Sequence, residues 1–390
     1  MFEAQASVAS AVRTPIGRFL GSLSGRSAIE LGVFAARAAI ERAGLKASEI
    51  DLTIVGNARP AGLGPNPARQ IAIGAGVPQD KVAYTLNMAC GSSSTAIVLG
   101  IQALTLGKAK RVLVGGSENM SRVPYLLTDA RMGYRMGHAP VVDGMYRDGF
   151  DCPIAKQVMG LTAETLAREY EVSREEQDRY ALMSQTRAAK AWEERAFDAE
   201  IKAIPAEGKL QGLDHDEHLR PNTSLEKLAK LPTVFDENGS VTAGSSSGLT
   251  DAACMLVLEK PGLREKPLAS ILDSESAGVD PARMGLGPVP ATRALMTRCG
   301  LNIDDFDLIE LNEAFAAQVI ACQRELRFDM EKTNVHGGAI ALGHPIGATG
   351  ARITTTLIHA LRRHGKGLGL STLCVSGGLG VSILVRNDAA

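Results

Sequence analysis

The sequence lacks the features that mark membrane, secreted or metal-binding proteins. No apolar run reaches the roughly 18 residues that a membrane-spanning helix needs. The opening segment MFEAQASVASAVRTPIG has no charged region followed by an apolar stretch, so no secretory signal is expected. The 6 cysteines are scattered, without a CxxC pair or a Cys/His cluster of zinc-like spacing. We therefore expect free thiols in a reducing compartment, no metal and a cytoplasmic protein.

The sequence also lacks an excess of charge of either sign. Lys and Arg total 42 against 43 for Asp and Glu, which gives a net charge of −1. This balance offers no electrostatic basis for binding a nucleic acid or a membrane surface. Glycine, in contrast, is abundant at 41 of 390 residues, which predicts many tight turns and close backbone approaches.

Short apolar strands alternate with helical patterns, which is typical of a layered α/β fold. Strands are expected at 51–56, 82–88, 111–115, 252–258, 308–311, 369–374 and 381–385, and helices at 31–43 and 96–106. The segment 163–201 differs, because it is rich in Glu, Arg, Lys, Gln and Ala and carries a capping-box pattern from Ser173 to Glu176. It predicts helices with a solvated face, outside the sheet.

A weak internal repeat favours two similar halves. Cys90 lies in a Gly/Ser-rich turn between an apolar strand and a helix, and His344 lies in a Gly-rich turn before a helix that runs to Leu361. Both turns are expected to follow a strand and to place a reactive side chain at a helix entrance.

Cys90 is the best candidate for a nucleophile. At a helix entrance its sulfur lies beside free backbone N–H groups and the positive end of the helix dipole, a setting that lowers the pKa of a thiol. The alternative is that Cys90 is a small buried hydrophobic residue, as most free cysteines are.

Three further turns carry candidate residues. His344, followed by a proline, is the better general base, while His336 in the same glycine-rich segment is the better structural histidine. Cys374 ends an apolar strand and enters a Gly-rich turn, so it can face a cavity. Asn312 follows another strand and can hold a water or a carbonyl oxygen, whereas the adjacent Glu313 is expected to anchor its loop.

These segments together resemble the thiolase family. The resemblance rests on the segments NMACGSSSTA, GGSENMS, VTAGSSSGLTDAA, MGLGPVPAT, ELNEAFAAQ, NVHGGAIALGHPIGATGAR and LCVSGGLGV, which stand in the family's order. It spans nearly the whole chain, and it raises the catalytic reading of Cys90 well above the alternative.

The resemblance implies a fold of two similar α/β halves stacked as an αβαβα sandwich with an inserted loop domain. The expected boundaries are 1–120 and 246–264 for the N-terminal half, 121–245 for the loop domain, and 265–390 for the C-terminal half. It also implies an acyltransferase that uses coenzyme A as co-substrate and no bound cofactor.

The resemblance also implies residue roles. Cys90 would attack a 3-ketoacyl-CoA, His344 would take the thiol proton, and Cys374 would protonate the departing acetyl-CoA enolate. One oxyanion hole would consist of His344 and a water held by Asn312. The other would use the backbone N–H groups of Cys90 and Ser376.

Contacts to the acyl-CoA substrate follow from the same resemblance. The residues implied are Met159, Arg220, Phe235, Ser247, Ala314 and Phe315. The sequence contains no P-loop that could hold the phosphates of coenzyme A, so these phosphates would contact side chains such as Arg220. The alternative for Arg220 is a solvated surface charge.

The specificity signal is mixed. Ser376 replaces a glycine of the family pattern, and Ser93 and Val158 depart from the short-chain biosynthetic type, yet the stretch 143–157 is as long as in that type. We favour 3-ketoacyl-CoA cleavage in β-oxidation over acetoacetyl-CoA synthesis. Another condensing enzyme and an inactive acyl-CoA-binding or structural subunit are weaker alternatives. The resemblance to the family also implies assembly as a homodimer or homotetramer, with a possible hydratase/dehydrogenase partner.

Overall fold

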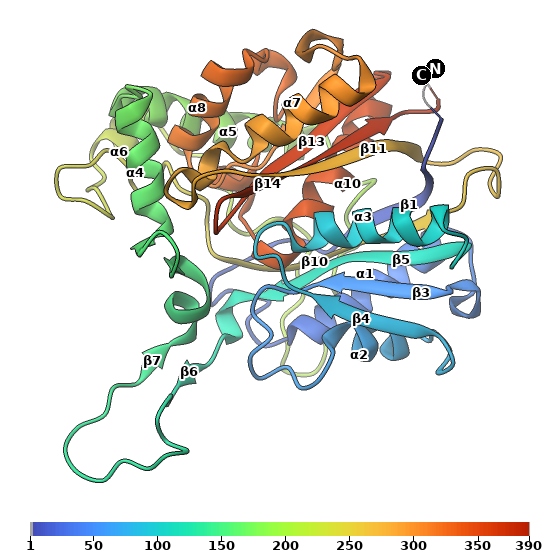
Figure 1. Ribbon diagram of the computed structural model, residues 1–390, viewed down its shortest axis with the longest axis horizontal. Coiled ribbons are helices and arrows are strands. Elements are labelled where there is room, and N and C mark those ends of the chain that lie inside the picture. Colours follow the sequence, from blue (N-terminus) through green and yellow to red (C-terminus); the bar gives the residue numbers. More distant parts are fainter. Residues whose placement is uncertain (1–2, 390) are drawn as a thin grey trace.

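The computed structural model describes residues 3–389 and has five layers (Figure 1). Helices α1 (Ala28–Arg42) and α2 (Pro67–Gly74) cover one outer face, and α7 (Pro288–Cys299) and α8 (Ala316–Leu326) cover the other. Helices α3 (Ser92–Thr105) and α10 (Thr349–Arg363) lie between the two halves of the sheet. The αβαβα arrangement expected from the sequence is confirmed.

The sheet is continuous through the molecule, because β1 and β11 join the halves. Its strand order is β12-β13-β14-β11-β1-β10-β5-β3-β4, with the short β2 paired to β10. The strands are β1 (Ala6–Arg13), β2 (Gly17–Arg18), β3 (Leu52–Gly56), β4 (Val82–Leu86), β5 (Arg111–Asn119), β10 (Thr250–Glu259), β11 (Ala269–Gly278), β12 (Leu308–Leu311), β13 (Leu368–Val375) and β14 (Leu379–Arg386). Strands β3, β4 and β5 run parallel, as do β12 and β13. Parallel neighbours end at the same edge of the sheet, and that edge carries the candidate site.

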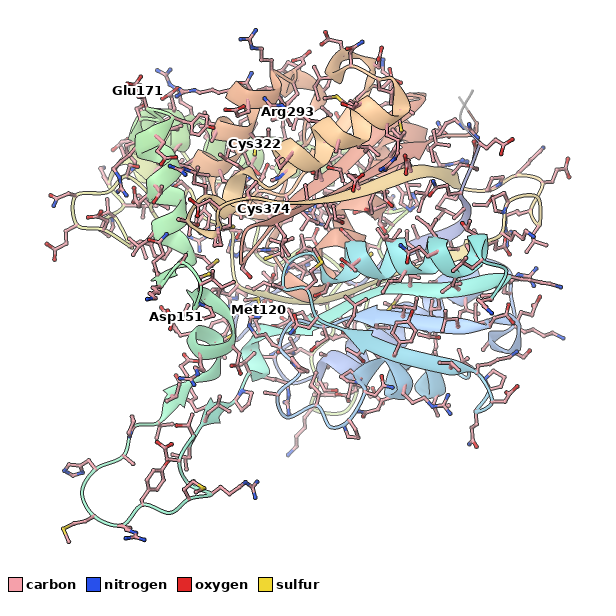
Figure 2. The ribbon with its side chains drawn as sticks, viewed as in Figure 1. Met120, Asp151, Glu171, Arg293, Cys322 and Cys374 are labelled. Carbon is pink, nitrogen blue, oxygen red and sulfur yellow. The ribbon has the colours of Figure 1, made fainter. Side chains whose placement is uncertain are left out.

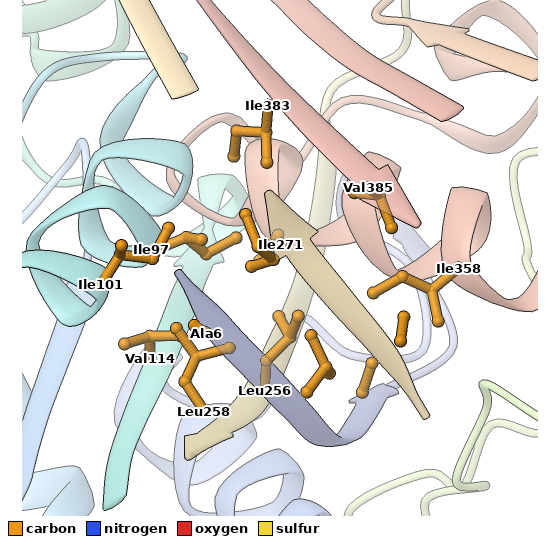
Figure 3. Close-up of a cluster of buried hydrophobic side chains, with 14 of the residues drawn as sticks. Ala6, Ile97, Ile101, Val114, Leu256, Leu258, Ile271, Ile358, Ile383 and Val385 are labelled. Atoms are coloured by element: carbon orange, nitrogen blue, oxygen red, sulfur yellow. The ribbon is translucent and has the colours of Figure 1, made fainter. Parts of the chain in front are cut away.

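The central layer buries the largest core. Ile97 and Ile101 of α3 and Ile358 of α10 pack with Leu256 and Ile383 from the two halves of the sheet (Figure 3). All five side chains are buried, so α3 and α10 are held from both sides. The turns that precede these two helices are therefore fixed relative to each other.

The segment between β5 and β10 stands outside the large sheet. Its four short strands pair as β6 (Tyr125–Leu126) with β7 (Val142–Asp143), and as β8 (Asp151–Cys152) with β9 (Gln157–Val158). A long hairpin beyond β6 and β7 projects away from the body (Figure 1). The helices are α4 (Met159–Glu169), α5 (Arg174–Glu193) and α6 (Leu225–Ala229).

Helix α5 begins where the sequence predicts it. The Ser173 side chain accepts from the Glu176 backbone N–H, and the Glu176 carboxylate accepts from the Ser173 N–H, so the expected capping box is present. The division of the chain into domains at the predicted boundaries stays a proposal. No helix within residues 3–389 is long and apolar enough to cross a membrane.

One local expectation is wrong. The turn that carries His344 follows a short helix, α9 (Ala339–Leu342), and not a strand. Glycines at both ends explain the difference, because Gly337 and Gly343 adopt φ of +74° and +106°, which ends any extended run. The internal repeat thus holds for the helices α3 and α10 but not for what precedes them.

We predict that the central layer carries much of the stability. Ile97→Ala in α3 should lower the free energy of unfolding by about 2–5 kcal/mol, since it leaves a cavity between the two halves of the sheet. Leu106→Ala, at the exposed end of the same helix, should change it by no more than about 0.5 kcal/mol. Equal effects in urea unfolding would contradict this assignment of the core.

Candidate active site

Cys90 lies in a rigid turn between β4 and α3. Ala89 has a φ of +45°, and the Ser92 hydroxyl accepts from the Met88 backbone N–H at 2.9 Å and donates to the Ala89 carbonyl at 2.7 Å. The hydrogen bonds fix a backbone that a non-glycine residue rarely adopts. The turn therefore holds the Cys90 side chain in one place at the entrance of the helix.

The turn after β13 meets the turn of Cys90. A Cβ at Gly91 would lie 2.8 Å from Cγ2 of Val375, so the Gly91 backbone lies directly against the Val375 side chain. The backbone N–H groups of Ser376 and of Cys90 itself both point to the Cys90 sulfur. Cys374 is fully buried nearby, close enough for the charge of Cys90 to raise its pKa. Figure 2 shows Cys374 in the middle of the molecule.

Both thiols are harder to ionise than the sequence predicts. Burial raises the pKa of Cys90, and it outweighs the opposing effects of the Arg59 charge and of the Ser376 and Cys90 N–H groups. Burial also raises the pKa of Cys374 well above its usual value. The expectation of a lowered thiol pKa is wrong, because the helix entrance lies inside the protein and desolvation dominates. The resting site holds neutral thiols.

Ser376 fits the turn without strain. The positive φ angles there belong to Gly377 and Gly378, at +88° and +87°, and not to Ser376. The replacement of a family glycine by serine therefore leaves the backbone N–H in place.

His344 lies in the turn between α9 and α10 and is buried. Its backbone N–H donates to the Gly248 carbonyl at 3.0 Å, and its Nδ1 lies 2.6 Å from Oγ1 of Thr349. That hydroxyl donates to the Pro345 carbonyl at 3.1 Å, so it accepts from Nδ1–H. Burial, followed by the charges of Arg352 and Arg59, lowers the pKa of His344 to about 3. The ring is neutral, and its Nε2 is free to accept a proton.

Glu118 on β5 ties two turns of the site together. Its carboxylate accepts from the backbone N–H of Ala58 at 2.9 Å and from that of Gly347 at 2.8 Å. Ala58 follows β3, and Gly347 lies three residues after His344. One buried carboxylate thus holds the His344 turn against the strand edge where Cys90 lies.

Asn312 follows β12, as predicted, and is fully buried. Neither polar atom of its side chain has a hydrogen-bond partner among residues 3–389. A buried amide of this kind needs a partner, and a water or a substrate oxygen can supply one. Glu310, in the same strand, lies 3.6 Å from Arg352, and burial raises the pKa of Glu310 to about 8.

Glu313 anchors its loop, as the sequence predicts. Its carboxylate accepts from Tyr180 Oη at 2.8 Å and Ser184 Oγ at 2.7 Å, both on α5. It also accepts from the Asn334 amide at 2.9 Å and from the Ile340 N–H at 3.0 Å, on the segment that leads to His344. His336 lies in this segment but pairs with His364, Nε2 to Nε2 at 3.2 Å, and so takes no part in the site.

The predicted acyl contacts gather around Cys374. Met159, Phe235, Ala314 and Phe315 belong to one apolar cluster with Cys374, and the rings of Phe235 and Phe315 meet edge to face at 6.0 Å. Met159 begins α4, so the inserted segment supplies one wall of this cluster.

Arg220 lines a cavity of about 380 Å³ beside the site. Lys227 and His218 also line it, and no acidic side chain does among the described residues. The His218 ring fills the space beside Gly248, whose carbonyl holds the His344 N–H, so the cavity borders the His344 turn. Ser247 directly precedes Gly248, and its backbone N–H donates to the Ala314 carbonyl at 3.0 Å.

Two residues of the site were missed by sequence reasoning, namely Arg59 and Glu118. Both lie at or beyond the carboxyl ends of strands that run parallel to β4, which is the one signal that points to them. No group of three or more His, Cys, Asp or Glu residues that could hold a metal occurs in the described part of the chain.

Comparison with known proteins agrees with the fold. The family models for the thiolase N-terminal domain and the thiolase C-terminal domain match residues 6–261 and 265–387. An acetyl-CoA acetyltransferase of Escherichia coli K12 is 48% identical over 97% of this chain and 98% of its own.

Two solved structures have the same fold. The crystal structure of the Bacillus anthracis acetyl-CoA acetyltransferase superposes with a TM-score of 0.95 at 41% identity, covering 99% of each chain. That of human mitochondrial 3-ketoacyl-CoA thiolase in complex with CoA gives 0.94 at 38% identity, covering 98% of each. The fold and the relatives define an acyltransferase. The chain belongs to the thiolase family.

We predict that His344 stays neutral, with its proton on Nδ1, from pH 5 to pH 8. Its pKa of about 3 lies well below this range, and the acceptor at Nδ1 is fixed by Thr349. Ring ¹⁵N shifts, assigned with His344→Gln, measure both properties. Thr349→Val should weaken the preference for the Nδ1 proton, whereas Thr349→Ser should keep it. A ring that titrates near pH 6.5 would contradict the prediction, because it would show that burial and the two arginine charges do not lower the pKa of His344.

Proposed function

We propose that the chain cleaves 3-ketoacyl-CoA into acetyl-CoA and a shortened acyl-CoA, through an acyl-enzyme on Cys90. The observation that carries this proposal is the proximity of the partly buried Cys90 thiol to the buried Cys374 thiol, with the backbone N–H groups of Cys90 and Ser376 directed at the Cys90 sulfur. One thiol can accept an acyl group while the other handles a proton.

The first step is attack of the Cys90 sulfur on the 3-keto carbon. His344 takes the thiol proton on Nε2, which is unprotonated because the ring proton is on Nδ1. The resulting alkoxide is bound by the N–H groups of Cys90 and Ser376. Each such donor contributes roughly 2.7–4 kcal/mol to stabilising the transition state.

In the second step the bond between C2 and C3 breaks. The acyl group stays on Cys90, and the electron pair passes to the acetyl-CoA enolate. Its thioester oxygen accepts from the protonated His344 and from a water on the unpaired amide of Asn312. Cys374 donates its proton to C2, and its raised pKa keeps it protonated until then.

Coenzyme A then takes the acyl group from Cys90. The CoA thiol gives its proton to the Cys374 thiolate, its sulfur attacks the thioester carbon, and the departing Cys90 sulfur takes back the proton held by His344. We assign the adenine nucleotide to the cavity lined by Arg220 and Lys227, where cationic side chains suit phosphates. The pantetheine would pass Ser247 and Gly248 toward His344, which the shared contacts of Gly248 support.

We assign the acyl chain of the substrate to the apolar cluster around Cys374. The cluster around Cys374 contains only apolar residues and cysteines, with Val158 beside it at the start of α4. This favours 3-ketoacyl chains longer than four carbons and a degradative direction, in agreement with fatty-acid β-oxidation. The alternative is an acetoacetyl-CoA thiolase that condenses two acetyl-CoA molecules, as the names of the bacterial relatives allow.

We also propose that the chain assembles as a homodimer or homotetramer. The projecting hairpin supports this, since its Met132 and Met136 side chains are 88% and 98% exposed. Exposed apolar residues on a long hairpin fit a contact with another copy.

Cys90 should become acylated when the enzyme is mixed with either acetyl-CoA or acetoacetyl-CoA. Intact-mass analysis should show one acetyl group, and Cys90→Ala should show none and lose activity by roughly a thousandfold or more. Cys374→Ala separates the two steps. It should accept acetyl from acetyl-CoA normally, because no carbon–carbon bond breaks, but should react with acetoacetyl-CoA at least about a hundredfold more slowly. An adduct on any other cysteine would refute the assignment of the nucleophile.

Rates with ketoacyl-CoA of increasing chain length should distinguish the two directions of use. We expect kcat/KM for thiolysis to hold or rise beyond four carbons, because each added methylene buried in the apolar cluster contributes about 0.8 kcal/mol. Phe235→Ala should reduce the gain for long chains more than the rate for acetoacetyl-CoA. A sharp optimum at four carbons, with efficient condensation of acetyl-CoA, would favour the biosynthetic alternative.

A further inference from the structure

Arg59 carries a buried guanidinium that makes no direct ion pair within residues 3–389. It is 5% exposed and follows β3 in the segment Asn57-Ala58-Arg59. Its Nη1 donates to the Ala58 carbonyl at 3.0 Å, while its Nε has no hydrogen-bond partner in residues 3–389. A buried charge of this kind is costly unless an anion faces it.

Glu118 makes no direct ion pair or hydrogen bond with the Arg59 guanidinium, although the positive charge of Arg59 lowers the pKa of Glu118 against the larger effect of burial. Its carboxylate is occupied by the backbone N–H groups of Ala58, Arg59 and Gly347 and by the Asn57 amide at 3.2 Å. These contacts involve the backbone of the Arg59 segment and not its side-chain nitrogens.

The guanidinium is enclosed on one side by the turn Tyr146–Phe150. Phe150 lies with its ring centroid 6.0 Å from Cζ of Arg59, and the Arg59 head fills the space where a Cβ of Gly149 would stand. Phe150 and Cys90 both pack against the same small apolar cluster, which contains Ala58 and Ile346. The aromatic neighbour of the Arg59 cation and the Cys90 thiol therefore border the same apolar cluster.

Arg59 is the one positive charge in the described structure that acts on Cys90. It has the largest effect among those that lower the pKa of the thiol, ahead of the two N–H groups. The other ionisable groups that face the site are Glu118 on β5, Cys374 on β13 and His344 before α10. Arg59 lowers the pKa of His344 as well, so its charge reaches both partners of the proposed proton transfer.

We propose that Arg59 is a positioning residue whose buried guanidinium is the counter-charge of the Cys90 thiolate and thereby sets the reactivity of the nucleophile. The inference rests on the proposed role of Cys90. In the resting enzyme the thiol is neutral, and Arg59 makes no direct ion pair within residues 3–389. When the proton moves to His344, the sulfur becomes an anion that the guanidinium can stabilise. The same charge disfavours the imidazolium and so favours onward transfer of the proton.

The thiolate can be measured without any acyl-CoA. The rate of Cys90 alkylation by iodoacetamide is followed against pH, with the Cys90 peptide quantified by mass spectrometry. Arg59→Met and Arg59→Gln should raise the midpoint by about one pH unit and slow alkylation at pH 7 roughly tenfold. Arg59→Lys, which keeps the charge, should stay within about threefold of the parent. Arg37→Met, an exposed arginine that caps α2 at the Gly74 carbonyl, should change nothing.

Two outcomes would overturn the proposal. One is a parental midpoint in folded Arg59→Met and Arg59→Gln. The other is an equal shift in all three variants that follows their melting temperatures, which would show that Arg59 only supports the turn of Phe150. Neither outcome depends on the acyl-enzyme, which intact-mass analysis reads separately.

A second comparison leaves Arg59 in place. Cys90→Asp puts a permanent anion at the position of the sulfur, and Cys90→Asn puts a neutral group of the same shape there. At pH 8 the Asp variant should melt at a higher temperature than the Asn variant if Arg59 faces this position. A lower melting temperature for Cys90→Asp would refute the counter-charge, because it would show that the buried carboxylate finds no partner.

Discussion

Desolvation of the reactive groups is the constraint on which the site depends. Cys90, Cys374 and His344 all lie where burial opposes charge, so both thiols and the imidazole rest in their neutral forms. A helix entrance at the surface would favour the thiolate at rest. Here the protein surrounds the entrance, and an ion pair can form only with the help of fixed donors and of the Arg59 charge.

The layered fold is what keeps this site dry and fixed. Helices α3 and α10 form the central layer and are packed from both sides by the two halves of the sheet (Figure 3). Cys90 lies in the turn before α3, and His344 lies in the turn before α10. Glu118 links the two regions by accepting hydrogen bonds from backbone N–H groups of both. Glu313 does the same on the far side by joining α5 to the segment before His344. Two buried carboxylates thus hold the turns without taking part in the chemistry.

Much of this could be predicted from the sequence, for physical reasons that differ between elements. Asn312 and Cys374 were placed correctly because short apolar runs end at them, and a parallel pair of strands brings those ends together. Strand β11 was missed because its second half is polar and partly exposed, so it has no apolar run. The strand expected before His344 was wrong because glycines at positive φ replace it with α9. The prediction of a lowered pKa for Cys90 was wrong because the sequence reveals only the local helix entrance. The burial of Cys90, which raises its pKa, depends on elements from the whole chain.

The place of Arg59 in the site could not be predicted from the sequence either. Its distance from Cys90 depends on the order β5-β3-β4, and no local pattern reveals strand order. A neutral resting site also suits a reversible reaction. A permanently ionised Cys90 would be stabilised before substrate arrives, and that stabilisation would have to be overcome in the transition state. At rest Arg59 makes no direct ion pair within residues 3–389, and the N–H groups of Cys90 and Ser376 face a neutral sulfur. These interactions therefore gain most of their strength only when negative charge appears. The arrangement therefore lowers the barrier in both directions, because the same anionic states are crossed in cleavage and in condensation.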